Sequence, residues 1–235
     1  QQQAEYKEAW EAAGMTCIFQ NAGEESQAPL RILRRLARYS YVCDMLRDFV
    51  FKAVTPDDIV VTTGCHEAIA ITLRALCRPG EAVAIESPFF FNHLQTMAAM
   101  GIKIVEIPSS PKDGISLEAL GYALEKTRVK ACLVSANFSN PTGSSMPDHR
   151  KKALVKMLAE RQIPLIEDDI YGDLSFSDTR PRAAKSFDGQ DLVILCSSFS
   201  KTLAPGYRVG WVAPGRFHQA IRHQRTINTL APASP

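Results

Sequence analysis

The chain has 235 residues, of which 46% are hydrophobic and 22% are charged, as in ordinary globular proteins. Its 27 basic and 25 acidic residues nearly balance, so the overall charge gives no reason to expect a nucleic acid or a membrane surface as a partner of this chain. No apolar run approaches the roughly 18 residues that cross a bilayer, and the start, Gln1–Lys7, lacks the apolar core of a signal peptide.

Residues 1–56 differ from the rest of the chain, because they are helix-prone and have few strand signals. We predict that they form an N-terminal helical arm that packs on the main domain or on a dimer partner. The arm is rich in arginine, which we interpret as a solvated helix face rather than a nucleic-acid patch. These arginines are Arg31, Arg34, Arg35 and Arg38.

From about residue 57 onward, short β-rich runs alternate with helical patterns. The expected strands are 59–63, 82–86, 102–107, 129–136, 164–168, 192–197 and 207–213, and the expected helices are 66–77, a segment ending at 100, 117–126 and 148–161. Apolar strands with little alternation, separated by helices, indicate an α/β fold with a mainly parallel sheet and helices on both faces. We therefore predict one domain over residues 57–235.

The cysteines are scattered along the chain and include no Cys-x-x-Cys pair. Several lie in apolar segments that we expect to be buried. Free thiols in a reducing compartment, the cytoplasm, are therefore expected rather than a disulfide framework. The six are Cys17, Cys43, Cys65, Cys77, Cys132 and Cys196.

Polar clusters follow several of the predicted strands. In open α/β sheets, ligands bind beyond the carboxyl ends of the strands. One polar residue at a strand end is commonplace, but four clusters on one sheet are hard to assign to folding alone. They are residues 63–66, 140–143, 168–171 and 197–201.

The last of these clusters begins a segment that reads Ser-Ser-Phe-Ser-Lys-Thr-Leu-Ala-Pro-Gly-Tyr-Arg-Val-Gly-Trp, residues 197–211. It resembles the lysine segment of the fold-type I, class I and II aminotransferases, and most closely that of the aminotransferase-like domain of MocR-type regulators in the GntR superfamily. Asn140-Pro141-Thr142-Gly143 and the spacing from Asp168 to Tyr171 match the same family. The resemblance covers roughly residues 57–230 and implies the fold-type I large domain with pyridoxal 5′-phosphate (PLP) as cofactor.

The resemblance implies roles for the residues around the PLP ring. Lys201 would hold PLP as a Schiff base, which requires a lysine pKa low enough to leave the amine partly neutral. Asp168 would lie beside the pyridine nitrogen and favour its protonated form. Asp169 is the alternative, since neighbours on a strand point to opposite faces. Tyr171 and Asn140 would donate hydrogen bonds to the phenolate oxygen of the ring.

Other residues would hold the phosphate. Gly64, Cys65 and His66 would offer backbone N–H groups at a helix start, where the helix dipole favours an anion. Ser198 and Arg208 match the hydroxyl and guanidinium partners of the family, and arginine suits a bidentate phosphate contact. The side chain of His66 is more simply interpreted as that of a helix N-terminal residue than as a ligand contact.

Phe90 stands where the family has an aromatic ring stacked on the pyridine. Three phenylalanines in a row, Phe89 to Phe91, are otherwise typical of a hydrophobic core. We predict that Phe90 is the stacking residue.

Two parts of the family pattern are not found in this chain. The arginine that binds the substrate α-carboxylate belongs to a C-terminal small domain, and the chain stops at Pro235 before such a domain. No clear Tyr-containing, Gly-rich segment precedes the main domain, where Tyr39 and Tyr41 are the candidates to reach a partner's phosphate. Because the chain also begins with Gln1 rather than Met, we expect it to be part of a longer protein.

The first functional hypothesis is an aminotransferase that moves an amino group between an amino acid and a 2-oxo acid, with Lys201 as the base for the Cα proton. The second is a domain of a transcription regulator that senses PLP or an amino compound, with DNA bound only through a segment outside this chain. A third, a structural relative without PLP, would leave all the matched polar residues without a role. Family members are usually homodimers, so a homodimer is expected, with no membrane association and no metal.

Overall fold

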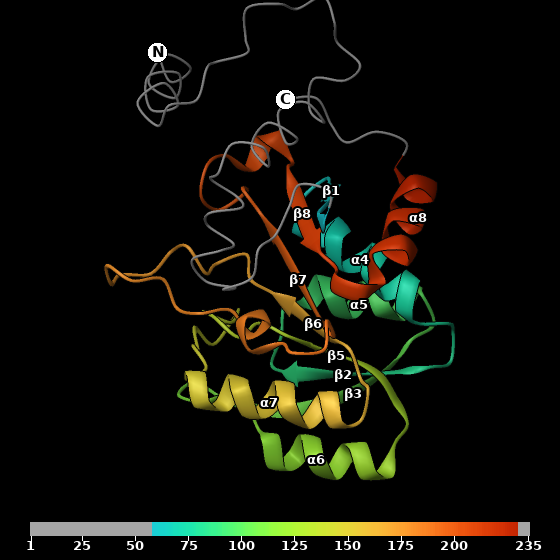
Figure 1. Ribbon diagram of the computed structural model, residues 1–235, viewed down its shortest axis with the longest axis vertical. Helices are drawn as coiled ribbons and strands as arrows, with labels where there is room; N and C mark the ends of the chain where they lie inside the picture. Colours follow the sequence, from blue (N-terminus) through green and yellow to red (C-terminus); the bar gives the residue numbers. More distant parts are fainter. Residues whose placement is uncertain (1–57, 230–235) are drawn as a thin grey trace, which may run out of the picture.

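A computed structural model describes residues 58–229, so the predicted N-terminal arm lies outside the described residues. An eight-stranded sheet forms the centre, in the order β1-β8-β7-β6-β5-β2-β3-β4 (Figure 1). The strands are β1 (Val60–Thr62), β2 (Ala82–Ser87), β3 (Lys103–Ser110), β4 (Gly114–Ile115), β5 (Val129–Val134), β6 (Leu165–Asp168), β7 (Val193–Ser198) and β8 (Gly210–Ala213).

The pairing is parallel across the middle of the sheet and antiparallel at its two sides. Strands β7, β6, β5, β2 and β3 pair in parallel, whereas β8 is antiparallel to both β1 and β7, and β4 is antiparallel to β3. Because β8 runs against both of its neighbours, β1 points the same way as β7. The carboxyl ends of β1, β2, β3, β5, β6 and β7 therefore meet at one edge of the sheet, together with the start of β8.

Helices cover both faces of the sheet (Figure 1). One hydrophobic cluster joins the sheet to α4 (Cys65–Leu76), α5 (Phe91–Ala99) and α8 (His218–Asn228). A second cluster joins the opposite face to α6 (Leu117–Lys126) and α7 (Asp148–Glu160). Three short 3₁₀ turns complete the described elements: η2 (Ala184–Phe187), η3 (Pro205–Tyr207) and η4 (Gly215–Phe217).

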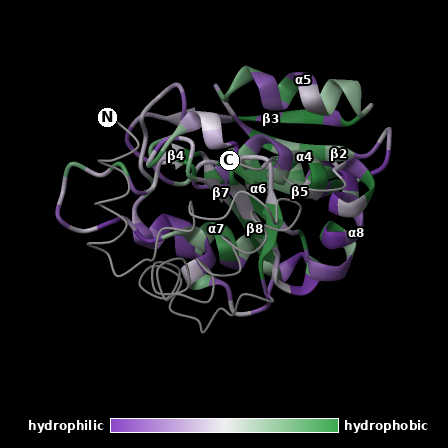
Figure 2. Ribbon diagram, turned by 90° about the horizontal axis from the view of Figure 1, so that it is seen from above, coloured by the Kyte–Doolittle hydropathy of each residue, from purple (hydrophilic) through white to green (hydrophobic). Residues whose placement is uncertain are grey.

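The central strands contribute residues to both hydrophobic clusters, because their side chains alternate between the two faces of the sheet. In β2, Val83 and Ile85 belong to the first cluster and Ala84 to the second. In β6, Leu165 and Ile166 divide in the same way. A strand buried on both faces needs apolar residues at every position, which explains the unalternating runs in the sequence. The central strands are accordingly mostly hydrophobic in Figure 2.

The fold confirms the predicted α/β class with a mainly parallel sheet and helices on both faces. Among residues 58–229, no helix combines the length and apolar composition that crossing a bilayer needs. The thiols of Cys65, Cys77, Cys132 and Cys196 are free, as expected. Cys17 and Cys43, like Tyr39 and Tyr41, lie outside the described residues.

Several strand boundaries were predicted wrongly. The expected strands 102–107 and 129–136 end at Ser110 and Val134, and the largest error in the start of a strand concerns β8. The expected strand 207–213 begins only at Gly210. Before it, η3 is followed by Arg208, whose φ of 51° is left-handed and incompatible with a strand. Arg208 therefore lies in a turn at the edge of the sheet.

Candidate functional site

The strand register brings the loops after β1 and β7 together. Gly210, the first residue of β8, is paired with Thr62 on one side and with Ser198 on the other. Thr62 and Ser198 are the last residues of their strands. The segments that follow, starting at Thr63 and Phe199, therefore leave the sheet on either side of the turn that carries Arg208.

Arg208 and Gly64 lie against each other at the start of α4. The guanidinium of Arg208 donates to the carbonyl of Thr63 at 3.1 Å and to Ser200 Oγ at 3.4 Å. Gly64 has a φ of 90°, and a Cβ there would lie 2.6 Å from Arg208 Nη2. Only glycine allows both this backbone conformation and the close approach of the guanidinium. Gly64 contributes no side-chain cap to α4, so the arginine and the helix N-terminus present positive charge together.

A second glycine packs β8 against the same loop. A Cβ on Gly210 would lie 2.5 Å from the carbonyl carbon of Gly64 and 2.9 Å from the backbone nitrogen of Cys65. These are backbone atoms, which cannot rotate away as a side chain could. The close contact between two backbones thus fixes the height of the α4 N-terminus above the sheet.

Asp168, the last residue of β6, is buried and held at both carboxylate oxygens. Its Oδ1 lies 3.3 Å from the Cys65 thiol and 3.3 Å from the backbone N–H of Ile170, both of which donate to it. Its Oδ2 lies 3.3 Å from His93 Nε2. Burial, followed by the nearby Asp168 charge, raises the pKa of Cys65 well above its ordinary value. Cys65 therefore acts here as a neutral thiol donor.

His93 connects Asp168 to a group of rings. Its ring stacks on His66 with centroids 5.3 Å apart and meets Phe90 edge-on at 5.4 Å. His93 is buried, and its Nδ1 has no hydrogen-bond partner. His66 lies within 3.2 Å of Thr96 Oγ1 and is only partly shielded from solvent. This partial desolvation, followed by the charges of His93 and Arg208, lowers its pKa.

Lys201 and Tyr171 face each other across the loops after β7 and β6. The Lys201 ammonium lies 5.8 Å from the centre of the Tyr171 ring. Ser198, at the end of β7, is buried and accepts a hydrogen bond from the backbone N–H of Ser200 at 3.3 Å. Asn140 is half-buried in the turn that follows β5, which the Gly143 N–H bond to Ser139 closes.

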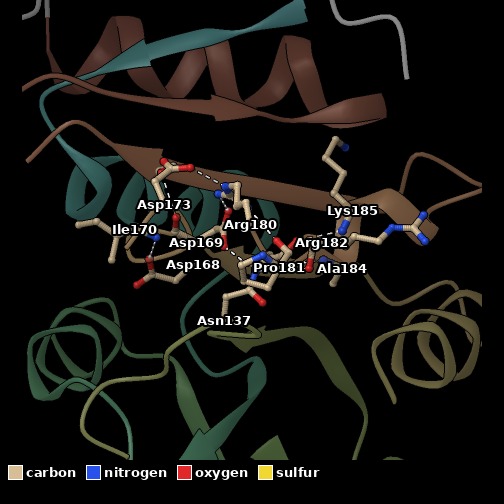
Figure 3. A network of polar contacts seen from close by, with 12 residues as sticks. Asn137, Asp168, Asp169, Ile170, Asp173, Arg180, Pro181, Arg182, Ala184 and Lys185 are labelled. Atoms are coloured by element: carbon tan, nitrogen blue, oxygen red, sulfur yellow. Dashed lines mark hydrogen bonds and ion pairs between the residues drawn. The ribbon is translucent and has the colours of Figure 1, made fainter. Parts of the chain in front are cut away.

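Asp169, the alternative to Asp168, is directed into a different environment (Figure 3). Asn137 Nδ2 donates to its Oδ1 at 2.9 Å, and Arg180 donates to its Oδ2. Burial raises the pKa of Asp169, and the Arg180 guanidinium opposes that rise. Asp169 is already paired with the Arg180 guanidinium, whereas the partners of Asp168 are a thiol, a backbone N–H and a histidine. This geometry supports the prediction that Asp168, rather than Asp169, would lie beside the pyridine nitrogen.

Within the described residues, the candidate cofactor-binding residues singled out from the sequence lie at the carboxyl edge of the sheet. The structure brings together Gly64 with Arg208, Cys65 with Asp168, His66 with Phe90 through His93, and Lys201 with Tyr171. Sequence reasoning missed His93 and Arg180, and it included Ser200 only as a member of the cluster 197–201. His93 comes one helical turn after Phe90, at the start of α5, and this spacing was the available signal.

The family model of the class I and II aminotransferases matches residues 34–229. The chain is 47% identical over 172 residues to the uncharacterised HTH-type transcriptional regulator YjiR of Escherichia coli, covering 73% of this chain and 37% of YjiR. It is 28% identical over 221 residues to the 2-aminoadipate transaminase of Thermus thermophilus, covering 89% of this chain and 53% of that enzyme.

Among solved structures, the α-aminoadipate aminotransferase LysN of Thermus thermophilus, complexed with N-(5′-phosphopyridoxyl)-L-leucine, has a TM-score of 0.78 at 26% identity. The match covers 97% of this chain and 57% of LysN. The chain thus spans less than two thirds of the length of these relatives. The chain belongs to the class I and II aminotransferase family.

Proposed function

We propose that this chain is the PLP-binding large domain of an aminotransferase, which holds PLP covalently on Lys201 and moves an amino group between an amino acid and a 2-oxo acid. The single observation that carries the proposal is the buried Asp168 carboxylate, held by Cys65 and His93, at the same sheet edge as the Lys201–Tyr171 pair. The match to the class I and II aminotransferase model supports it.

The residues present fit the chemical needs of PLP. Its phosphate needs donors and positive charge, which the N-terminus of α4 and Arg208 supply beside Gly64, whose lack of a side chain lets the guanidinium approach the loop. Its pyridine nitrogen needs a carboxylate, and Asp168 is the buried one at this edge whose oxygens contact a thiol and a histidine rather than a guanidinium. Its aldehyde needs an amine, which Lys201 supplies.

When bound, PLP supplies an electron sink that stabilises negative charge on the Cα of an attached amino acid. Asp168 would keep the proton on the ring nitrogen. Lys201 would carry the proton to and from Cα. Tyr171 and Asn140 would donate hydrogen bonds to the phenolate oxygen, and Phe90, whose ring already meets His93, would stack on the pyridine.

Phosphate binding would draw on a further set of groups. The backbone N–H groups of Gly64, Cys65 and His66 open α4, and the Ser198 hydroxyl adds a donor from the end of β7. Arg208 lies against this loop through Thr63. These roles follow the resemblance of the sequence and agree with the position of each residue at one edge.

Covalent attachment to Lys201 can be tested by borohydride reduction of the full-length protein loaded with PLP, followed by peptide mass mapping. We expect the pyridoxyl group on the peptide that contains Lys201. Lys201→Ala should abolish the modified peptide, whereas Lys152→Ala, on the outer face of α7, should leave it unchanged. Modification of a different lysine, with Lys201 untouched, would refute the assignment.

Amino-group transfer is tested separately, by adding each common amino acid to the loaded full-length protein and measuring release of its 2-oxo acid by mass spectrometry. At least one amino acid should release stoichiometric product in a single turnover. Release from none of them, with PLP shown to be bound, would remove the enzymatic part of the proposal and leave PLP binding intact.

That second outcome would favour a sensing domain of a GntR/MocR-type transcription regulator. The specific observation behind this candidate is the 47% identity to the HTH-type regulator YjiR, together with 40% identity over 182 residues to the HTH-type regulator YdcR of the same bacterium. DNA contact would then belong to a segment outside this chain. A gene that encodes a DNA-binding module upstream of Gln1 would support it.

The proposal includes a cytoplasmic homodimer. The free thiols of Cys65, Cys77, Cys132 and Cys196 suit a reducing compartment. Light scattering of the full-length protein should give twice the monomer mass, and a monomeric mass at micromolar concentration would contradict the dimer.

A further inference from the structure

The turn after β6 carries both Asp168 and Tyr171. Two backbone hydrogen bonds close it, from the Gly172 N–H to the Asp169 carbonyl at 3.4 Å and from the Leu174 N–H to the Tyr171 carbonyl at 2.9 Å. The first of these is long for a hydrogen bond. The backbone bond across the first part of the turn is thus the weaker of the two.

Arg180 bridges this turn from the far end of the following loop. Its guanidinium donates to the carboxylates of Asp169 and Asp173, which lie on either side of Tyr171 in the sequence (Figure 3). The Asp169 side chain is fully buried, and that of Arg180 is 17% exposed. A largely desolvated guanidinium bound to two carboxylates in a fixed fork geometry constrains both ends of the turn.

Gly172 supplies independent support for this bridge. A Cβ at this position would lie 2.7 Å from Arg180 Cζ and 2.6 Å from Asp169 Oδ1. The ion pair therefore occupies the space that any other residue at position 172 would fill. The Arg180 guanidinium thus packs directly against the backbone of the turn at Gly172.

The buried side of the bridge is also anchored. Asn137 Nδ2 donates to Asp169 Oδ1 at 2.9 Å, and Lys151 Nζ donates to Asn137 Oδ1 at 2.6 Å. Lys151 is buried and donates also to the carbonyl of Arg182 at 2.6 Å. The bridge thus connects the turn after β6 to the loop after β5 and to helix α7.

We infer that Arg180 is a positioning residue, which fixes the Tyr171 phenol toward the cofactor ring by clamping Asp169 and Asp173. The inference rests on the proposed function, because it presumes that Tyr171 donates to the phenolate oxygen of bound PLP. Loss of the clamp would let the Tyr171 ring move away and so change the protonation equilibrium of the bound cofactor, which that hydrogen bond tunes.

The first test is a pH titration of the visible absorbance of PLP bound to the full-length protein. Tyr171→Phe, which removes the donor, should shift the midpoint by about one pH unit or more, and Arg180→Lys should shift it in the same direction by about half a unit. The double variant should titrate like Tyr171→Phe alone, because both changes remove one hydrogen bond. Arg216→Ala is the matched control, since Arg216 donates to Gln162 on the surface.

The second test needs no cofactor and uses hydrogen–deuterium exchange of the same protein without PLP. Arg180→Lys should raise exchange of the Gly172 and Leu174 amides by roughly tenfold, the factor that corresponds to about 1.4 kcal/mol of lost local stability. Asp173→Ala, which removes the more exposed arm of the clamp, should act in the same direction with a smaller effect. Exchange in α8 should not change in either variant.

Gly172→Ala provides a variant that retains the arginine. Its methyl group should displace the guanidinium and reproduce the midpoint shift of Arg180→Lys, whereas Gly189→Ala, with open space around its Cβ, should not. If Arg180→Lys fails to fold, Gly172→Ala and Asp173→Ala decide the outcome.

Midpoints equal to that of the wild type in these variants, or additive shifts in the double variant, would overturn the positioning role. A wild-type protein without a visible band would instead overturn the proposed function, and this inference with it.

Discussion

At the scale of single residues, Glu86 shows how the edge of the sheet places a carboxyl group where ionisation is costly. Glu86 is buried near the end of β2 and accepts a hydrogen bond from the backbone N–H of Ser135 at 2.6 Å. Burial raises its pKa from the ordinary 4.5 to about 7, and the Ser135 bond opposes the rise. The folded protein therefore holds this proton more tightly than the unfolded chain, and stability falls as the pH rises from about 4.5 to about 7.

Glu86→Gln should remove this pH dependence, because glutamine keeps the acceptor oxygen for Ser135 and does not ionise. Relative to the wild type, the free energy of unfolding of the variant should grow by on the order of 3 kcal/mol between pH 4 and pH 8. Urea denaturation at a series of pH values measures it. Glu160→Gln, at the exposed end of α7, is the control, and a constant difference for Glu86→Gln across the range would contradict the expectation.

A substitution of Arg208 tests the proposed contact between its guanidinium and the phosphate of PLP. Its guanidinium lies against Gly64 and Thr63, where the phosphate of PLP would bind. Arg208→Ala should weaken PLP binding by roughly 10- to 100-fold, as for loss of a charge-assisted hydrogen bond. Pyridoxal, which lacks the phosphate, should bind the variant and the wild type equally.

The comparison of the two ligands distinguishes phosphate recognition from damage to the fold. Binding is measured by titration of the cofactor absorbance, and Arg216→Ala serves as the surface control. Equal losses for PLP and pyridoxal in Arg208→Ala would show that the arginine supports the loop rather than the phosphate.

At the scale of elements, the contact between β8 and the start of α4 depends on Gly210. Gly210→Ala would push a methyl group into the backbone of Gly64 and Cys65. We expect a loss of about 2 kcal/mol in the free energy of unfolding, typical of overpacking, and weaker PLP binding because the helix N-terminus moves. Gly189→Ala, with no atom near the added Cβ, should be nearly neutral in both denaturation and binding measurements. Equal effects of the two substitutions would remove the argument for this contact.

Local signals explain which elements could be predicted from the sequence. The helix Leu117–Lys126 was predicted with the observed bounds, and the Ser116 hydroxyl caps its start by accepting from the Ala119 N–H at 3.2 Å. Strand β4 was not predicted, because its two residues are strand only through pairing with β3. The start of β8 was misplaced because the left-handed conformation of Arg208 depends on its contacts across the edge.

The same distinction applies to the candidate site. Motif residues such as Lys201 and Asp168 stand out within short strings of sequence. The roles of His93 and Arg180 arise from tertiary contacts: His93 is 75 positions from Asp168, and Arg180 reaches back 11 positions to Asp169. The helical spacing from Phe90 to His93 does not identify Asp168 as a partner, and no local pattern predicts the contact of Arg180 with Asp169.

At the scale of the whole molecule, the site joins segments that are distant in the sequence. The loops after β1, β5, β6 and β7 meet at one edge of the sheet. Each loop follows directly from a strand that contributes residues to the hydrophobic core. A ligand held by Gly64, Asp168 and Lys201 at once would therefore link parts of the chain that separate only on global unfolding. Binding at this edge should be coupled to the stability of the entire sheet.

Ligand-linked stability follows from this arrangement. A ligand that binds only the folded protein adds RT ln(1 + [L]/Kd) to the free energy of unfolding, about 2.7 kcal/mol at 100 times Kd. PLP should therefore shift the whole unfolding transition, followed by circular dichroism in urea, without splitting it in two. Lys201→Ala should need a higher PLP concentration for the same shift, because it retains the phosphate contacts and loses the covalent bond. If PLP instead shifted only a separate, later unfolding transition, the cofactor would stabilise just part of the sheet. Binding at this edge would then not be coupled to the stability of the entire sheet.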